Sequence, residues 1–71
     1  MKWSAQPEFL KPRYFEIKQD PAAGFYLYVY EDGKCLFDQL QDTLEIAIEC
    51  AQEDYNVPKN SWKKIERNNP K

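Results

Sequence analysis

Histidine is absent from this 71-residue sequence, and cysteine occurs only twice. Without histidine, the serine and threonine hydroxyls lack the base that usually activates them as nucleophiles, and four-ligand zinc is nearly excluded. Cys35 and Cys50 are too few and too widely spaced for a disulfide framework or a CxxC site, so we expect two reduced thiols. We therefore predict that the protein is not an enzyme and has no metal and no cofactor.

A long apolar segment is also missing, so we expect neither a signal peptide nor a membrane span. The formal net charge of −2 implies no general affinity for nucleic acid or for an anionic membrane. The simplest expectation is a cytoplasmic protein of bacterial type. Apolar residues nevertheless make up 42% of the chain and aromatic residues 15%, which is typical of a single small folded domain.

The strongest pattern in the chain is the aromatic run FYLYVY at residues 25–30. Alternation along a strand gives it one face with Phe25, Leu27 and Val29 and another with three tyrosines. The alternating segment 13–19 predicts a strand before it. The Asp-Gly pair at 32–33 predicts a tight hairpin leading to a third strand at about 34–39.

A helix is predicted at about 42–55, followed by a short fourth strand at 62–66. Asp42 and Glu45 have the spacing of a capping box, and Asn56 and Pro58 favour termination of the helix. The expected fold is α+β: a three-stranded antiparallel meander, one helix on one face and a short C-terminal strand, in the order βββαβ. We expect an irregular arm at 1–12, one domain at 13–66 and a disordered tail at 67–71.

One helix covers only one face of a sheet, so the other face is the candidate interface. The residues assigned to the helix-covered core are Phe15, Ile17, Phe25, Leu27, Val29, Cys35, Phe37 and Ile65. The residues assigned to the candidate interface are Tyr14, Tyr26, Tyr28, Tyr30 and Trp62. Tyrosine and tryptophan suit contact surfaces because each has an apolar body and a polar tip.

The predicted role is a small non-catalytic module that binds an unidentified protein partner or a second copy of itself through this aromatic face. One alternative is that the N-terminal arm folds over the face, with Trp3 and Phe9 filling the gap. Another is that nucleic-acid bases stack on the tyrosines, as in a ribonucleoprotein accessory. The sequence does not favour nucleic acid, because acidic residues interrupt the region and no RNP-type motif is present.

The outer face of the predicted helix is a second candidate surface. It is acidic and carries one apolar residue, the set being Glu45, Ile46, Glu49 and Glu53. A basic partner would complement such a face, although acidic helix faces are more often simply solvated.

Residues 14–62 resemble small bacterial proteins of unassigned function that share a GFYLY strand, an Asp-Gly hairpin, a DTLE helix start and a tryptophan beyond the helix. The segment TLEIA at 43–47 is also similar to the helix entry of HicB-like antitoxins, whose partial ribonuclease-H-like domain runs βββαβ. The proline that precedes Gly-Cys in that family is missing here, as is the glycine before the helix. The resemblance implies a non-catalytic partner-binding domain and assigns no functional residue.

Overall fold

The computed structural model describes residues 1–65. The end of the predicted domain and fourth strand at residue 66, and the predicted tail at 67–71, lie outside the described residues. Within residues 1–65 the elements are β1 (Lys2–Ala5), η1 (Glu8–Leu10), β2 (Arg13–Asp20), β3 (Gly24–Glu31), β4 (Lys34–Gln41), α1 (Leu44–Tyr55), η2 (Lys59–Ser61) and β5 (Lys63–Ile65).

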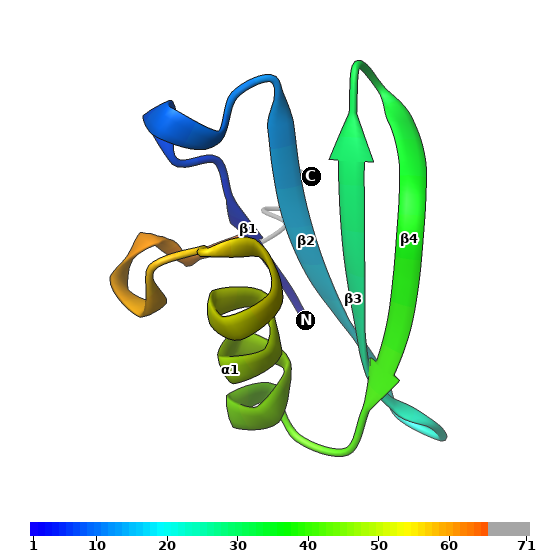
Figure 1. The fold of residues 1–71 in the computed structure, drawn as a ribbon. Coiled ribbons are helices and arrows are strands. Elements are labelled where there is room, and N and C mark those ends of the chain that lie inside the picture. The colour runs from blue at the N-terminus through cyan, green and yellow to red at the C-terminus, as the bar shows by residue number, and fades with distance from the viewer. Residues whose placement is uncertain (66–71) are drawn as a thin grey trace, which may run out of the picture.

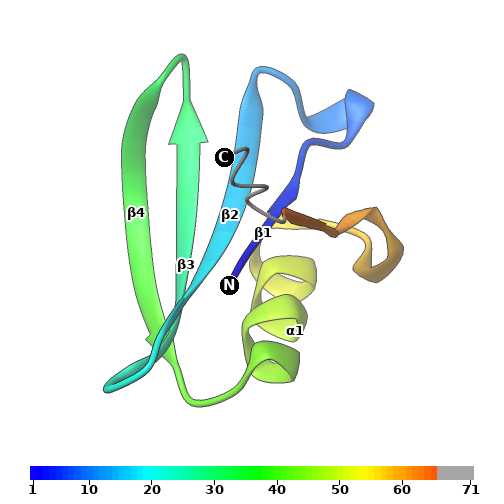
Figure 2. The ribbon, with the colours of Figure 1, turned by 180° about the vertical axis from the view of Figure 1, so that it is seen from behind.

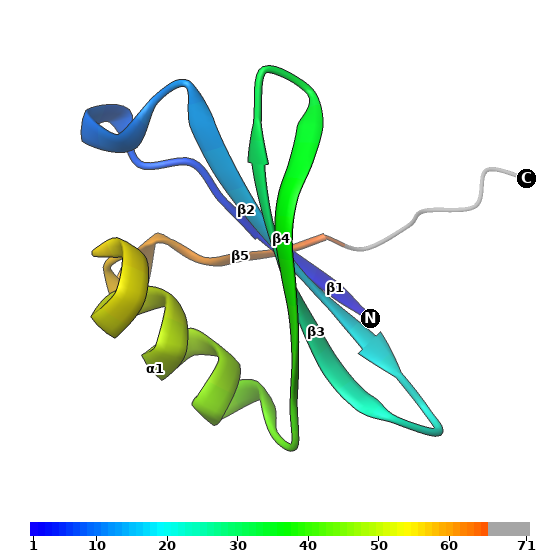
Figure 3. The same ribbon diagram turned by 45° about the vertical axis from the view of Figure 1, so that its right-hand side comes forward.

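The fold is α+β, as predicted, with an antiparallel sheet and one α-helix in the described residues. The sheet has five strands within residues 1–65, in the order β4-β3-β2-β1-β5. Figure 1 shows α1 packed beside these strands, and Figure 3 shows that α1 lies on one side of the sheet. No helix in the described part of the chain is long and apolar enough to cross a membrane.

The three-stranded meander of the prediction is confirmed and forms β2, β3 and β4. Asp32 and Gly33 have φ angles of 54° and 80°, which the tight hairpin between β3 and β4 requires. Before β3, the Asp20 carboxylate accepts hydrogen bonds from the backbone N–H groups of Ala22 and Ala23, at 2.8 and 3.2 Å. These local bonds close the first hairpin.

The N-terminal segment is not an irregular arm throughout. Lys2–Ala5 forms β1, which lies between β2 and β5 and pairs antiparallel with both. Its sequence KWSA alternates, so Trp3 and Ala5 point to the helix side while Lys2 and Ser4 point to the other. The prolines at 7 and 12 flank a 3₁₀ turn rather than preventing a strand before them.

The predicted fourth strand is confirmed at 63–65, but it does not stand beside an edge of the meander. It pairs with β1 in the register Lys2↔Ile65, and β1 separates it from β2. The fold therefore has the order ββββαβ rather than βββαβ within residues 1–65.

The helix begins two residues later than predicted, because β4 continues to Gln41. Thr43, not Asp42, is the N-cap, and its Oγ1 accepts a hydrogen bond from the backbone N–H of Ile46 at 3.1 Å. Asn56 ends the helix in the left-handed conformation, as predicted, with φ 63° and ψ 31°.

The core lies between α1 and the sheet. Small residues on the inner side of the helix, Ala47 and Ala51, are fully buried and allow close packing against the strands. The buried apolar residues are Ala5, Phe15, Ile17, Leu27, Val29, Ala47, Ala51 and Val57. Burial of these side chains is the main source of folding free energy.

Three residues assigned to the core are exposed, and two of them lie on the face of the sheet away from the helix. The two-residue hairpin at Asp32 and Gly33 pairs Cys35 with Tyr30, so Cys35 lies on the face away from the helix and is exposed. A bulge after this pair shifts the register, so that Phe37 pairs with Val29. Phe37 faces the helix side but is 53% exposed, because it lies at the margin of the area that α1 covers. Ile65 is 41% exposed and lies opposite Lys2, on the face away from the helix.

Candidate interaction surface on the open sheet face

The face of the sheet opposite α1 carries Tyr14, Tyr26, Tyr28 and Tyr30, and we call it the tyrosine face. Directly opposed residues of antiparallel strands point to the same face, so the strand register defines its rows. One row runs Ile65–Lys2–Lys18–Tyr26–Leu40, the next Lys63–Ser4–Glu16–Tyr28–Asp38, and the third Tyr14–Tyr30–Cys35. Figure 2 shows β4, β3, β2 and β1 in this order across the sheet, seen from behind.

The four tyrosines predicted as an interface form one continuous series of ring contacts. Tyr14 and Tyr30 stack across β2 and β3, with ring centroids 4.7 Å apart and planes 10° apart. Tyr30 and Tyr28 are 6.2 Å apart, and Tyr28 and Tyr26 are 6.0 Å apart. All four side chains are half-buried, so part of each tyrosine remains accessible to solvent.

The N-terminal arm does not cover the tyrosine face in the described residues, so the alternative in which Trp3 and Phe9 fill that face is wrong. Trp3 lies on the helix side, with its ring centroid 5.9 Å from that of Phe25. Phe9 is 67% exposed in η1. Because α1 also lies on the opposite side, the tyrosine face is open within residues 1–65 (Figure 3).

Trp62 does not belong to the tyrosine face. It precedes β5 and packs against the hydrophobic core, together with Trp3. Its indole nitrogen is buried and has no hydrogen-bond partner among the described residues. The prediction placed Trp62 and Ile65 on the wrong faces, because the pairing of β5 with β1 was not visible in the sequence.

Three lysines also lie on this face, and Lys2 was not expected there from the sequence. Lys2 and Lys18 are in the same cross-strand row as Tyr26, and Lys63 is in the row of Tyr28. The Nζ of Lys2 lies 3.7 Å from a carboxylate oxygen of Glu16. The alternation in KWSA was the signal that could have placed Lys2 here.

The electrostatic environment keeps the central tyrosines protonated. Burial raises the pKa of Tyr28 above 10.0, and the nearby carboxylate of Asp38 raises it further. Burial likewise raises the pKa of Tyr30, with a smaller contribution from Glu16. A phenol is already neutral at physiological pH, and the raised pKa extends the neutral form, with its O–H donor, to higher pH.

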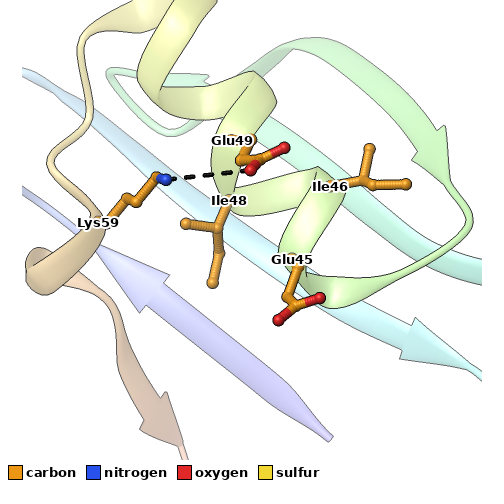
Figure 4. Close-up of a pocket in the computed structure, with 5 residues that line it drawn as sticks. All are labelled: Glu45, Ile46, Ile48, Glu49 and Lys59. Carbon is orange, nitrogen blue, oxygen red and sulfur yellow. Dashed lines mark ion pairs between the residues drawn. The ribbon is translucent and has the colours of Figure 1, made fainter.

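The second predicted surface, on the outer side of α1, contains a pocket of about 440 Å³. Glu45, Ile46, Ile48, Glu49 and Lys59 line it, and Figure 4 shows Ile46 and Ile48 directed to different sides of the helix. An oxygen of Glu49 lies 4.0 Å from the Nζ of Lys59, which partly neutralises the acidic surface. The predicted residue Glu53 is exposed and does not line this pocket.

The inner boundary of the acidic surface includes a thiol. Burial raises the pKa of Cys50, and Asp54, Glu53 and Glu49 raise it further. Such a thiol is a poor nucleophile. Within residues 1–65, no group of three or more histidine, cysteine, aspartate or glutamate residues is arranged to hold a metal ion.

No family model matches the sequence, and comparisons with curated proteins and with solved structures gave no match. The similarity to HicB-like antitoxins therefore stays a prediction. The functional proposal therefore depends on the geometry of the described residues.

Proposed function

We propose that the protein is a non-catalytic binding module that contacts a partner protein through the tyrosine face. The main support is the series of three ring contacts that joins the four tyrosines on a sheet face that no described segment covers. Tyrosine clusters supply contact area at a small cost in side-chain entropy, and their hydroxyl groups add directional hydrogen bonds. An open aromatic surface of this kind usually marks a contact site.

The charges around the tyrosines define the chemistry of the partner. Lys2, Lys18 and Lys63 lie on β1, β2 and β5, and Glu16 on β2 partly offsets their charge. Asp38 lies on β4 at the other side of the rings. A complementary protein surface has an apolar centre, acidic groups opposite the lysines and a basic group opposite Asp38. Such an arrangement fixes the orientation of the partner.

Site-specific photo-crosslinking in the native host tests the proposal. The photoreactive residue p-benzoylphenylalanine is introduced in place of Tyr28, and in a matched variant in place of Ile46 on the outer side of α1. We expect a discrete protein adduct from the Tyr28 position and none from the Ile46 position. Adducts only from the Ile46 position would contradict the proposal, as would their absence from both.

A pair of charge substitutions separates binding from folding. Tyr28→Glu places a second carboxylate opposite Asp38 and removes a central ring, so we expect loss of the captured partner. Ile46→Glu changes an exposed residue and leaves capture unchanged. Circular dichroism checks that both variants fold. Retention of the partner by folded Tyr28→Glu would overturn the proposal.

A second candidate is binding of single-stranded nucleic acid to the same face. The observation that favours it is the row that combines Lys2 and Lys18 with Tyr26, because bases stack on rings while lysines contact phosphates. A labelled oligonucleotide would then bind at low salt and weaken steeply as salt rises. Lys18→Glu would weaken binding, whereas Lys11→Glu in the turn after η1 would not. Absence of binding at low salt excludes this candidate.

A further inference from the structure

The two edges of the sheet differ in their protection against other strands. In its described residues β5 carries Lys63 and Lys64, and lysine on an edge strand discourages pairing. β4 is eight residues long and carries only Lys34 and Asp38 as charged residues. It is the last strand on its side of the sheet, so one row of its backbone donors and acceptors faces outward (Figure 1).

The exposed edge is also apolar. Leu36, Phe37 and Leu40 are 42%, 53% and 48% exposed, and all three belong to β4. They lie on both faces of the strand, with Leu40 on the tyrosine face and Phe37 on the helix side. An exposed edge strand of this length and composition is a template for strand addition.

The bulge restricts pairing to one part of β4. The register with β3 is interrupted between Val29 and Tyr30, near the hairpin, and is regular from Phe37 to Gln41. Bulges twist an edge away from a neighbouring strand. The regular stretch 37–41 is therefore the part of the edge that accepts another strand.

We propose that a second copy of this chain pairs with β4 in an antiparallel, two-fold-symmetric arrangement. Identical antiparallel edges match each other in length and twist, and a two-fold dimer is the commonest assembly of identical chains. The net charge of −2 on each copy causes little repulsion between them. This contact is made by the outer edge of β4, which borders the tyrosine face at Asp38 and Leu40. It does not require a partner to be bound on the tyrosine face.

The charges on β4 select the register. In an antiparallel pair, directly opposed residues point to the same face of the sheet. The two-fold axis must therefore lie between two copies of the same residue, for example between the two copies of Asp38 or of Gln39. An axis at Asp38 would oppose two carboxylates, which is unfavourable. An axis at Gln39 instead sets Asp38 opposite Leu40 of the second copy, and Phe37 opposite Gln41 of the second copy, and it uses the whole regular stretch.

The symmetry of the pairing has a structural consequence for the tyrosine face. The two-fold axis is perpendicular to the joined sheet, so both helices lie on one side and both tyrosine faces on the other. The dimer presents one aromatic surface of doubled extent, and a partner bound there would gain a second contact site.

Sedimentation velocity at roughly micromolar to millimolar concentrations tests the pairing. We expect the weight-average mass to rise from 8.5 kDa toward twice that value. Leu40→Lys places a charge on the edge and should shift the dissociation constant by at least about tenfold, or abolish the dimer. Phe9→Lys, which changes an equally apolar exposed residue in η1, is the matched control and should remain dimeric.

A register-specific crosslink provides the second test. In a background with Cys35→Ser and Cys50→Ser, Gln39→Cys places two thiols across the axis at a separation that permits a disulfide. A mild oxidant such as diamide should then convert it to a covalent dimer, while Leu36→Cys in the same background should not crosslink. A wild-type chain that is monomeric at the highest concentration overturns the inference. So does a dimer that is lost in Phe9→Lys but not in Leu40→Lys.

Discussion

The two faces of the sheet are made by the same strands and serve different purposes. In β3, Leu27 is fully buried and Val29 is 1% exposed against the helix side, whereas the alternating Tyr26, Tyr28 and Tyr30 are half-buried on the other side. The first set lies between two layers and has no contact with solvent. The second set packs ring against ring and stays partly exposed to solvent. One strand thus supplies both the stability of the domain and its candidate contact surface.

The largest expected difference between the faces is in the free energy of unfolding that is lost when adjacent residues of β3 are truncated to alanine. Leu27→Ala leaves a cavity in the core and should lower the free energy of unfolding by about 3 kcal/mol. Tyr28→Ala leaves no enclosed cavity and should cost about 1 kcal/mol. Urea unfolding followed by circular dichroism measures both. Equal losses would show that the tyrosine face is also structural.

If Leu27→Ala does not fold, Ile17→Val removes one methyl group from a fully buried side chain. It should cost about 1 kcal/mol and keeps the comparison measurable.

A smaller effect is expected from the coupling of rings within the tyrosine face. A double-mutant cycle of Tyr14→Leu and Tyr30→Leu should give a coupling energy of about 1 kcal/mol, because these rings are stacked 4.7 Å apart. The matched pair Tyr14→Leu and Tyr26→Leu has no direct ring contact among those described and should be additive. If the changes in the free energy of unfolding were additive for both pairs, the rings would stabilise the fold through buried area alone and not through specific stacking.

The smallest expected effect is the alkaline pH dependence of stability. The pKa of Tyr28 and that of Tyr30 are raised above 10.0 in the folded protein, mainly by burial. Between pH 10 and the folded pKa, the unfolded state has already lost these protons while the folded state retains them. The free energy of unfolding therefore falls as pH rises through this window and is unaffected by these groups below it.

Urea titrations at a series of alkaline pH values measure this slope. The variant with Tyr28→Phe and Tyr30→Phe should show a shallower decline, and Asp38→Asn should lower the pKa of Tyr28 toward its ordinary value. An identical slope in the wild type and the double variant would contradict the burial of these phenols.

Local patterns in the sequence were sufficient to predict most of the secondary structure. The alternation in residues 13–19, the Asp-Gly hairpin and the helix end at Asn56 were correct because each depends on neighbouring residues. The helix start was wrong by two residues, because pairing with β3 extends β4 to Gln41. The bulge that pairs Phe37 with Val29 also depends on contacts between strands.

The tyrosines of the candidate site were predicted, whereas the position of Lys2 beside them was not. The four tyrosines share a face because alternation and the hairpin turn dictate it. Trp62 was assigned to that face and Lys2 was not, because the place of Trp62 depends on where β5 pairs and that of Lys2 on where β1 pairs. Nothing within a short window of sequence records that pairing.

The sequence by itself determined which side chains share a face within each strand, since successive residues of a strand always point to opposite sides. Tertiary structure decided which strands are neighbours, which face α1 covers and which edge is left unpaired. Because β1 lies between β2 and β5, Trp62 packs against the core and Lys2 and Lys63 lie on the same face as the tyrosines. The same strand order leaves β4 as the long exposed edge. These outcomes follow from burying the most apolar surface of the whole chain, which is a property of the assembled elements and not of any one of them.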